Sequence, residues 1–220
     1  MTQTGTTERR AEERERRRHE IIHAALDEFL ESGYDATTMA AVARRARLSK
    51  GLLYHYFRDK DDLLMAITLD GLEHLQTEFR KAAASKRTGL EKTVAVGLTY
   101  LGFTEKFPLH FEAMDRFDAK QIDTEQGEAF ERECVKASGG VHGVVIEAIQ
   151  TGIEDGSIRN TVGDPRMVAI LLWSFLHGVQ QVVRKKGSMI KEGYGFERAD
   201  VEEQAIVFCR RNLAADPNAI

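Results

Sequence analysis

The helical spacing of apolar residues constrains the fold of this 220-residue chain more than any other feature. Apolar side chains recur three and four residues apart along most of the sequence, and the alternation typical of strands is scarce. Only three prolines interrupt the pattern, which favours long helices. Hydrophobic residues make up 42% of the chain and charged residues 30%, as in soluble globular proteins with a buried core. We therefore expect an all-α protein.

Capping residues, glycines and prolines divide this pattern into separate helices. The first is expected to start near His19 and to end at Gly33, a common helix terminator. A short helix is expected after Ser49, and a glycine-containing loop at Gly187–Gly195. The other helices are expected at residues 39–46, 60–84, 90–105, 108–118, 124–154, 166–185 and 198–213.

The segment Thr37–Asp62 contains two short helical patterns on either side of a tight break at residues 47–49. Thr38 and Ser49 are good N-caps for the two helices. In the second pattern, Leu53 and Phe57 would face inward, which leaves a polar side exposed. This is the arrangement of a helix-turn-helix, whose second helix enters the major groove of DNA.

The residue types on that second helix suit two kinds of DNA contact. Lys50 can donate to guanine O6 and N7, and Leu52 could meet a thymine methyl group. Gly51 lacks a side chain where the backbone must approach DNA closely. The remaining candidates carry hydroxyl, imidazole or ammonium donors for phosphates: Thr38, Ser49, Tyr54, His55, Tyr56 and Lys60.

The stretch Ile21–Ile67 resembles the TetR family of transcriptional regulators. The residues that carry the resemblance are Ala25, Phe29, Gly33, Thr37, Thr38, Ser49, Lys50, Gly51, Leu53, Tyr54, Phe57 and Lys60. The resemblance implies an all-helical homodimer with an N-terminal three-helix helix-turn-helix domain and a C-terminal ligand-binding and dimerisation domain. It also implies base contacts from residues 50–52. Arg47 departs from the family, which commonly has glycine at this turn; a left-handed arginine would cost about 1–2 kcal/mol.

The expected domains are a flexible arm at 1–18, the DNA-binding domain at 19–66 and the effector and dimerisation domain at 67–220. The arm contains an Arg/Glu run at residues 8–18, with six arginines and four glutamates. It could enter the minor groove, but a solvated helix extension is the favoured interpretation.

Aromatic residues recur at helical intervals in the C-terminal part and could line an apolar effector pocket. The candidates are Tyr100, Phe103, Phe107, Phe111, Met114, Trp173 and His177, with Phe117 and Phe130 as further aromatics. For any one of them, ordinary core packing is the alternative. Their character suggests a lipophilic or aromatic effector.

The segment Arg166–Lys185 is apolar almost all round, so it must be covered on most sides. One face can pack on its own domain and another on a second copy, and Gly178 would permit a close crossing. The alternative is a helix buried within a monomer. Its apolar part, Met167–Val183, is judged too short and too polar for a membrane span.

Other function classes find little support. The net charge is −4, but residues 1–60 hold 12 lysines and arginines against 10 acidic residues, so the N-terminal part is mildly basic. Cys134 and Cys209 are isolated, as for reduced thiols in a cytoplasm, and the histidines lack metal-ligand spacing. We expect no metal, no cofactor, no membrane association and no enzymatic activity.

The sequence thus predicts a cytoplasmic homodimer that binds a double-stranded DNA operator, most often as a repressor, and responds to a small-molecule effector. One alternative is a helical ligand-binding or enzymatic protein that retains an unused helix-turn-helix. A second is an activator or a global DNA-coating protein instead of a local repressor.

Overall fold

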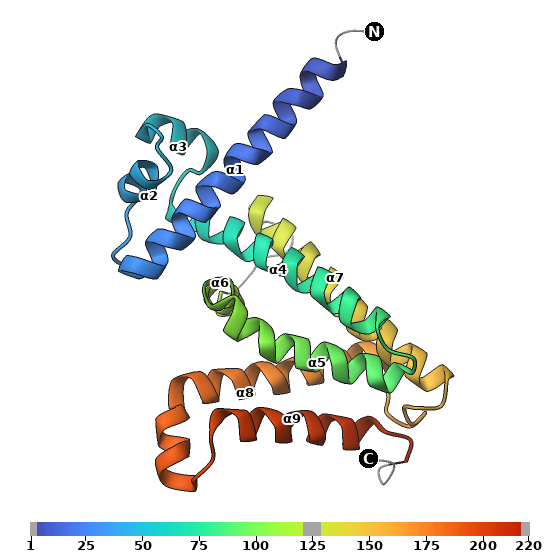
Figure 1. The fold of residues 1–220 in the computed structure, drawn as a ribbon. Coiled ribbons are helices and arrows are strands. Elements are labelled where there is room, and N and C mark those ends of the chain that lie inside the picture. Colours follow the sequence, from blue (N-terminus) through green and yellow to red (C-terminus); the bar gives the residue numbers. More distant parts are fainter. Residues whose placement is uncertain (1–3, 121–128, 217–220) are drawn as a thin grey trace. The chain divides into compact units, whose positions relative to one another are not determined.

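The computed structural model describes residues 4–120 and 129–216 (Figure 1). Within these ranges the chain forms nine α-helices and no strand, so the predicted all-α class is confirmed. The helices are α1 (Thr4–Ser32), α2 (Met39–Arg45), α3 (Lys50–Tyr56), α4 (Lys60–Ala84), α5 (Gly89–Lys106), α6 (Pro108–Asp118), α7 (Ala129–Glu154), α8 (Pro165–Tyr194) and α9 (Arg198–Leu213).

Two helices are longer than the sequence predicted. Helix α1 begins at Thr4 instead of near His19, so residues 4–18, expected as a flexible arm, are helical. Helix α8 runs to Tyr194 across a kink at Lys186, so the helix predicted at 166–185 ends at that kink, but residues 187–194 are helical and the loop expected at Gly187–Gly195 was wrong. The backbone leaves helical geometry only at Lys186 (φ −129°, ψ 15°), and Gly195 ends the helix in the left-handed region at φ 76°. The expected residues 124–128 of the seventh helix lie outside the described residues.

The chain divides into two compact units. The first contains Met1–Gly71 and Leu109–Cys134, and the second contains Leu72–Pro108 and Val135–Ile220. This division differs from the expected boundary after residue 66, because α6 and the start of α7 belong with the N-terminal helices. Helix α4 contributes residues to both units.

The first unit is built around α1, α2 and α3, with α2 packed on both neighbours. Leu53 of α3 and Phe57 just after it are both 0% exposed, which confirms that they face inward. The Phe57 ring stacks with that of Phe130 at a centroid distance of 6.3 Å. Phe130, considered for the effector pocket, therefore belongs with the helix-turn-helix core.

In the second unit, α8 and α9 pack against each other and both pack on α5. Residues from α7, α8, α9 and the loop after α7 form one buried apolar cluster in this unit: Ile149, Ile158, Val168, Ala169 and Leu213. The N-terminus of α5 approaches α7 so closely that a Cβ on Gly89 would lie 1.9 Å from the Gly152 nitrogen. Glycine is thus required at this helix contact.

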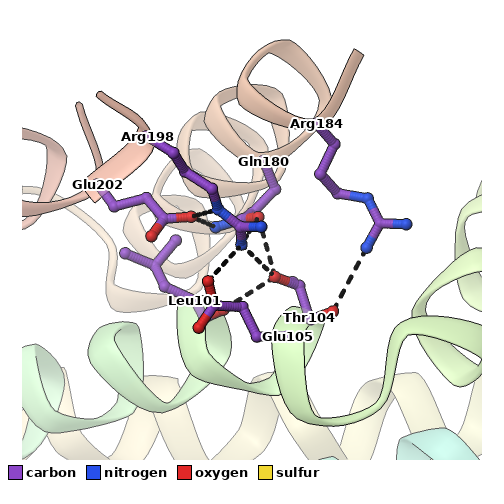
Figure 2. A network of polar contacts seen from close by, with 7 residues as sticks. All are labelled: Leu101, Thr104, Glu105, Gln180, Arg184, Arg198 and Glu202. Carbon is purple, nitrogen blue, oxygen red and sulfur yellow. Dashed lines mark hydrogen bonds and ion pairs between the residues drawn. The ribbon is translucent and has the colours of Figure 1, made fainter. Parts of the chain in front are cut away.

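A buried polar network joins α5, α8 and α9 (Figure 2). The fully buried Gln180 accepts hydrogen bonds at Oε1 from Thr104 (3.0 Å) and Arg198 (3.2 Å). Its Nε2 donates to Glu202 Oε1 at 2.8 Å, and Arg198 Nε donates to the same oxygen at 2.6 Å. Because each polar group of Gln180 has a partner, its burial costs little and the network fixes the three helices in one register.

One helix in the described part of the chain, α8, passes the length and composition criterion for a membrane span. By length and composition the expectation that its apolar part is too short and too polar for a span is not met, although the kink at Lys186 leaves only residues 165–185 in one unbroken helix. Only 28% of its most apolar stretch is buried. An exposed apolar face of this size requires a covering surface.

Candidate nucleic-acid interface

The turn between α2 and α3 is a Schellman motif centred on Arg47. The Arg47 N–H donates to the Arg44 carbonyl (3.1 Å), and the Leu48 N–H donates to the Ala43 carbonyl (2.9 Å). Arg47 has φ 56°, and no other described non-glycine residue has a positive φ. The conformation that the sequence allowed as a possibility is therefore present, and it redirects the chain into α3.

Both short helices begin with the side-chain caps that the sequence predicted. Thr38 Oγ1 accepts from the Ala41 N–H at 3.2 Å, and Ser49 Oγ accepts from the Leu52 N–H at 3.2 Å. Each cap residue is extended and exposed. In each case the hydroxyl oxygen is the acceptor, so the hydroxyl proton can still be donated to a phosphate.

The structure brings the other α3 candidates together on one helix. Lys50, Gly51, Leu52, Tyr54 and His55 are exposed, and Tyr56 is half-buried. Tyr54 keeps 50% of its surface in contact with solvent, although Leu53 beside it is fully buried. The helix thus separates an apolar inner side from a donor-rich outer side, as a DNA-reading helix does.

Lys60 is placed differently from the other candidates. Its ammonium donates to the carbonyls of Tyr34 (2.8 Å), Asp35 (3.2 Å) and Thr37 (3.2 Å), and it lies 4.4 Å from the Tyr34 ring centroid. All three ammonium protons are used within the chain. Lys60 therefore closes the loop between α1 and α2 onto the start of α4.

Two ion-pair clusters hold the scaffold of this interface. Arg45 of α2 donates from Nε to Glu28 (2.7 Å) and also pairs with Glu31, both on α1. Before α4, Arg58 contacts Asp62 through its backbone N–H and two guanidinium nitrogens. The Arg58 hydrogen bonds hold the pKa of the Asp62 carboxyl below its ordinary value of 3.8, although burial opposes the shift.

Residues 21–67 match the family model described as bacterial regulatory proteins, tetR family. This stretch of the chain is therefore similar to the DNA-binding domain of the TetR family. The matched residues make up about a fifth of the chain and include the C-terminal part of α1 and all of α2 and α3. The HTH-type transcriptional regulator HbdR of Aromatoleum sp. (strain CIB) is 47% identical over 65 residues, which are 30% of this chain and 28% of that protein. The chain thus spans little more than a quarter of that curated relative.

Solved structures show that the likeness in fold extends beyond this domain. A protein of unknown function from Rhodococcus sp. RHA1 aligns with a TM-score of 0.72 at 20% identity, over 90% of this chain and 95% of that one. The transcriptional regulator FadR of Bacillus subtilis, solved in complex with stearoyl-CoA, aligns with a TM-score of 0.66 at 16% identity, over 87% and 96%. At these identities the shared property is the fold.

The effector candidates predicted from the sequence fall into separate groups. In the second unit, the Tyr100 hydroxyl and His177 Nδ1 lie 2.9 Å apart, and the Trp173 ring centroid is 5.8 Å from that of His177. Phe103 and Phe107 form another ring pair at 4.9 Å. Phe111 and Met114 are buried in the first unit.

The apolar face of α8 is exposed as one stripe. Met167, Leu171 and Phe175 recur four residues apart, Val182 follows seven residues after Phe175 on the same side, and each is at least 37% exposed. Gly178 lies in the same stripe, and a Cβ there would meet nothing within 4 Å. Phe208 of α9 continues the surface, with its ring centroid 5.2 Å from that of Phe175. We call these six residues the α8–α9 stripe.

The described residues contain no group of three or more His, Cys, Asp and Glu side chains that could hold a metal. Cys134 and Cys209 are buried free thiols, and burial raises the pKa of Cys134 to about 12 and that of Cys209 to about 11. Thiols with such pKa values stay protonated at neutral pH and are poor nucleophiles or ligands.

Proposed function

We propose that this chain regulates transcription as a homodimer, most often as a repressor. It binds a pseudo-palindromic operator through two copies of α3 and leaves it when a lipophilic or aromatic molecule binds. The observation that carries the proposal is the exposed donor face of α3, Lys50–Tyr56, set on a helix whose other side is fully buried. Two such helices about 34–36 Å apart would enter successive major grooves.

The site residues divide into two roles in this proposal. Lys50, Gly51 and Leu52 read base edges, since they occupy the first turn of α3. The hydroxyls of Thr38 and Ser49, with Tyr54, His55 and Tyr56, hold phosphates. Lys60 acts through the loop carbonyls that it binds, and we assign it to holding the interface in shape.

The α8–α9 stripe supports the homodimer. An exposed, continuous apolar surface on two helices is unfavourable in water and is a suitable interface for a second copy. A two-fold interface uses the same patch on both copies, and residues near its axis meet their own counterparts. With the axis near Gly178, the two α8 helices could approach closely there.

An acyl chain or aromatic ring is the effector class that we propose. The candidates in the second unit are aromatic, with a single hydrogen-bonded polar pair, Tyr100 and His177, among them. The FadR structure of the same fold was solved with stearoyl-CoA, a ligand of that protein. We propose a ligand-binding region within residues 67–220 and a cytoplasmic location.

Coupling requires that the effector bind the DNA-incompetent form better than the competent one. We assign to α4 the role of transmitting the effector signal to the DNA-binding helices, because α4 contributes residues to both units. We call α4 the lever in this sense. In the first unit, α6 contacts this lever through His110 Nε2, 2.9 Å from Asp70 Oδ2, and contacts the α1–α2 loop through Arg116, 4.5 Å from the Tyr34 ring centroid. A movement of α6 would therefore reach the loop that precedes α2.

The experiment that tests this function compares DNA binding by the wild type and by the double variant Lys50→Ala, Tyr54→Ala. The probe is a duplex that the wild type selects from a random pool. We expect the double variant to bind at least about 100-fold more weakly and to keep its dimer mass. The matched control is Lys86→Ala, Tyr194→Ala, which removes the same side chains from exposed positions outside the helix-turn-helix.

Two outcomes would count against the proposal. One is a double variant that binds as tightly as the control. The other is wild-type binding that does not weaken with salt, since phosphate contacts release counterions. Failure to select any duplex would favour the alternative of an unused helix-turn-helix.

A further inference from the structure

Charges on the N-terminal part of α1 are sorted by helix face. At about 3.6 residues per turn, five arginines fall within one half of the helix circumference, and three glutamates fall within the other. The arginine half contains Arg9, Arg10, Arg14, Arg16 and Arg17, with Glu13 among them; the other half contains Glu8, Glu12 and Glu15. The segment is therefore not a mixed, solvated run, although its overall charge is small.

Three of these arginines have no partner in the part of the chain that the structure describes. Arg16 pairs with Glu13 at 2.6 Å, and Arg17 pairs with Glu20 at 2.6 Å. Within the described residues, Arg9, Arg10 and Arg14 make no ion pair or hydrogen bond, and all three are exposed. Unpaired like charges on one helix face repel one another, so an anion placed among them would be favoured.

The same three arginines line an open groove together with Glu13 and Tyr56. Its volume is about 470 Å³. Tyr56 is the last residue of α3, so the groove connects the α1 extension to the helix with the exposed donor face. The base of the extension is held in place by Arg18, whose guanidinium lies 4.6 Å from the Phe130 ring centroid and 5.7 Å from that of Phe57.

We propose that this groove binds the phosphate backbone of duplex DNA at the edge of the operator half-site. The planar guanidinium forks of Arg9, Arg10 and Arg14 match phosphate geometry, and the Tyr56 hydroxyl supplies a further donor. The groove lies outside residues 21–67, the part of the chain that matches the family model, apart from Tyr56. The α1 extension thus widens the DNA footprint without reading bases.

DNA is the occupant that the surroundings favour. A helix that is polar all round and exposed along residues 8–16 makes no core contact that would explain its arginine face. Its groove adjoins α3 rather than any apolar surface of the first unit. A phosphate chain that leaves α3 past Tyr56 would pass directly along the three arginines.

The inference rests on the proposed DNA-binding function. The salt dependence of binding tests the groove separately, because it counts the phosphate contacts that the groove adds. The test measures affinity for the selected duplex from about 50 to 300 mM salt for the wild type and for Arg9→Gln, Arg10→Gln, Arg14→Gln. Each lost phosphate contact makes the slope of log K against log salt shallower by about 0.9. With at least one contact in each protomer, we expect the triple variant's slope to be shallower by about two and its binding to be about tenfold weaker.

The duplex itself supplies a second measurement. Trimming the flanks to the selected core should weaken the wild type and leave the triple variant unchanged. The variant Arg9→Lys, Arg10→Lys, Arg14→Lys should keep the wild-type slope of log K against log salt, because the three positive charges remain. Circular dichroism and dimer mass establish that each variant is folded.

The control Arg80→Gln, Lys86→Gln, Arg87→Gln removes three exposed cations from the second unit and makes the same change in net charge. The inference would be overturned if the triple variant at Arg9, Arg10 and Arg14 kept the wild-type salt slope, or if this control lost as much slope and affinity as that variant. Either result would leave the proposed function intact. A wild type that binds no duplex would overturn both.

Discussion

Arg47 lies in the left-handed region of backbone space at φ 56°, where a side chain costs about 1–2 kcal/mol. Its N–H and that of Leu48 complete the Schellman motif that turns α2 into α3. Glycine would adopt this conformation without the Cβ penalty, although it gives the unfolded chain more freedom. We expect Arg47→Gly to raise the free energy of unfolding by up to about 1 kcal/mol in urea titrations.

A comparison variant separates backbone strain from side-chain loss. Arg47→Ala removes the guanidinium but keeps the Cβ, so it should not stabilise the protein. If the alanine and glycine variants gained equal stability, the side chain rather than φ would be responsible.

Asp62 provides a pH-dependent contribution to the start of α4. Its pKa is held below 3.8, chiefly by the side-chain hydrogen bonds from Arg58, and the carboxylate is nearly buried. A folded-state pKa below the unfolded one means that the stabilisation is present above about pH 4 and is lost as the pH falls through the folded pKa. We expect Asp62→Asn to lower the free energy of unfolding by about 1–3 kcal/mol near pH 6.

The difference in unfolding free energy between Asp62→Asn and the wild type should narrow when the urea titrations are repeated near pH 3, because the carboxyl of the unfolded chain is then protonated while the folded one resists protonation. If the difference in unfolding free energy stayed constant from pH 6 to pH 3, the ion pair between Arg58 and Asp62 would not be its source.

At the scale of elements, the α5–α7 contact depends on glycine. A Cβ on Gly89 would lie 1.9 Å from the Gly152 nitrogen and 2.5 Å from the Ala148 carbonyl oxygen, and backbone cannot move aside cheaply. We expect Gly89→Ala to lower the free energy of unfolding by about 1–3 kcal/mol or more in thermal or urea denaturation.

Gly102 on the same helix is the matched control. A Cβ there meets nothing within 4 Å, so Gly102→Ala should be neutral or stabilise by up to about 1 kcal/mol through helix propensity. Equal effects of the two substitutions would contradict the close-approach explanation.

Local signals explain which elements the sequence could predict. Thr38, Ser49 and Pro108 mark helix starts through chemistry that acts within one turn, and α2, α3 and α6 begin where these residues indicate. The glycines after Lys186 suggested a loop; the backbone does break at Lys186, but glycine only weakens a helix, and residues 187–194 form a further helical segment. The capping box of Thr88 and Glu91 was a readable signal that was overlooked.

Contacts between distant residues explain what the sequence could not give at the candidate site. The donor face of α3 follows from helical spacing, so Lys50–Tyr56 could be predicted. Lys60 binds three carbonyls about 25 residues away, and nothing in its local sequence indicates this. The groove of Arg9, Arg10 and Arg14 depends on Tyr56, which lies more than 40 residues further along the chain. Only the charge sorting on α1 could have been found from helical periodicity.

At the scale of the whole molecule, the α8–α9 stripe and the buried Gln180 network lie on the same two helices. The stripe is exposed, whereas the network is buried where these helices meet α5. Gln180 and Arg198 hold the helices on α5 through satisfied hydrogen bonds. Leu171 and Phe175 of the stripe remain exposed. The polar network can therefore keep the stripe in shape while a second copy supplies the apolar contacts. Surface variants of the stripe should then affect association without unfolding the second unit.

Leu171→Glu tests this separation. Leu171 is 60% exposed, so the folded chain can accept a carboxylate there, but a two-fold interface would bury two of them. Because an unpaired buried charge is costly, we expect the dimer dissociation constant to rise at least about 100-fold, with an unchanged helical spectrum. Light scattering after size exclusion measures the mass of the protein. The affinity for the selected duplex measures the loss of two-site binding.

Leu98→Glu is the matched control, since Leu98 of α5 is 52% exposed and lies outside the stripe. It should leave the dimer mass and the affinity for the duplex as in the wild type. A Leu171→Glu protein that remained dimeric would place the interface elsewhere on the chain. A Leu171→Glu monomer that bound the full operator as tightly as the wild type would instead show that the two copies of α3 are not linked through this surface.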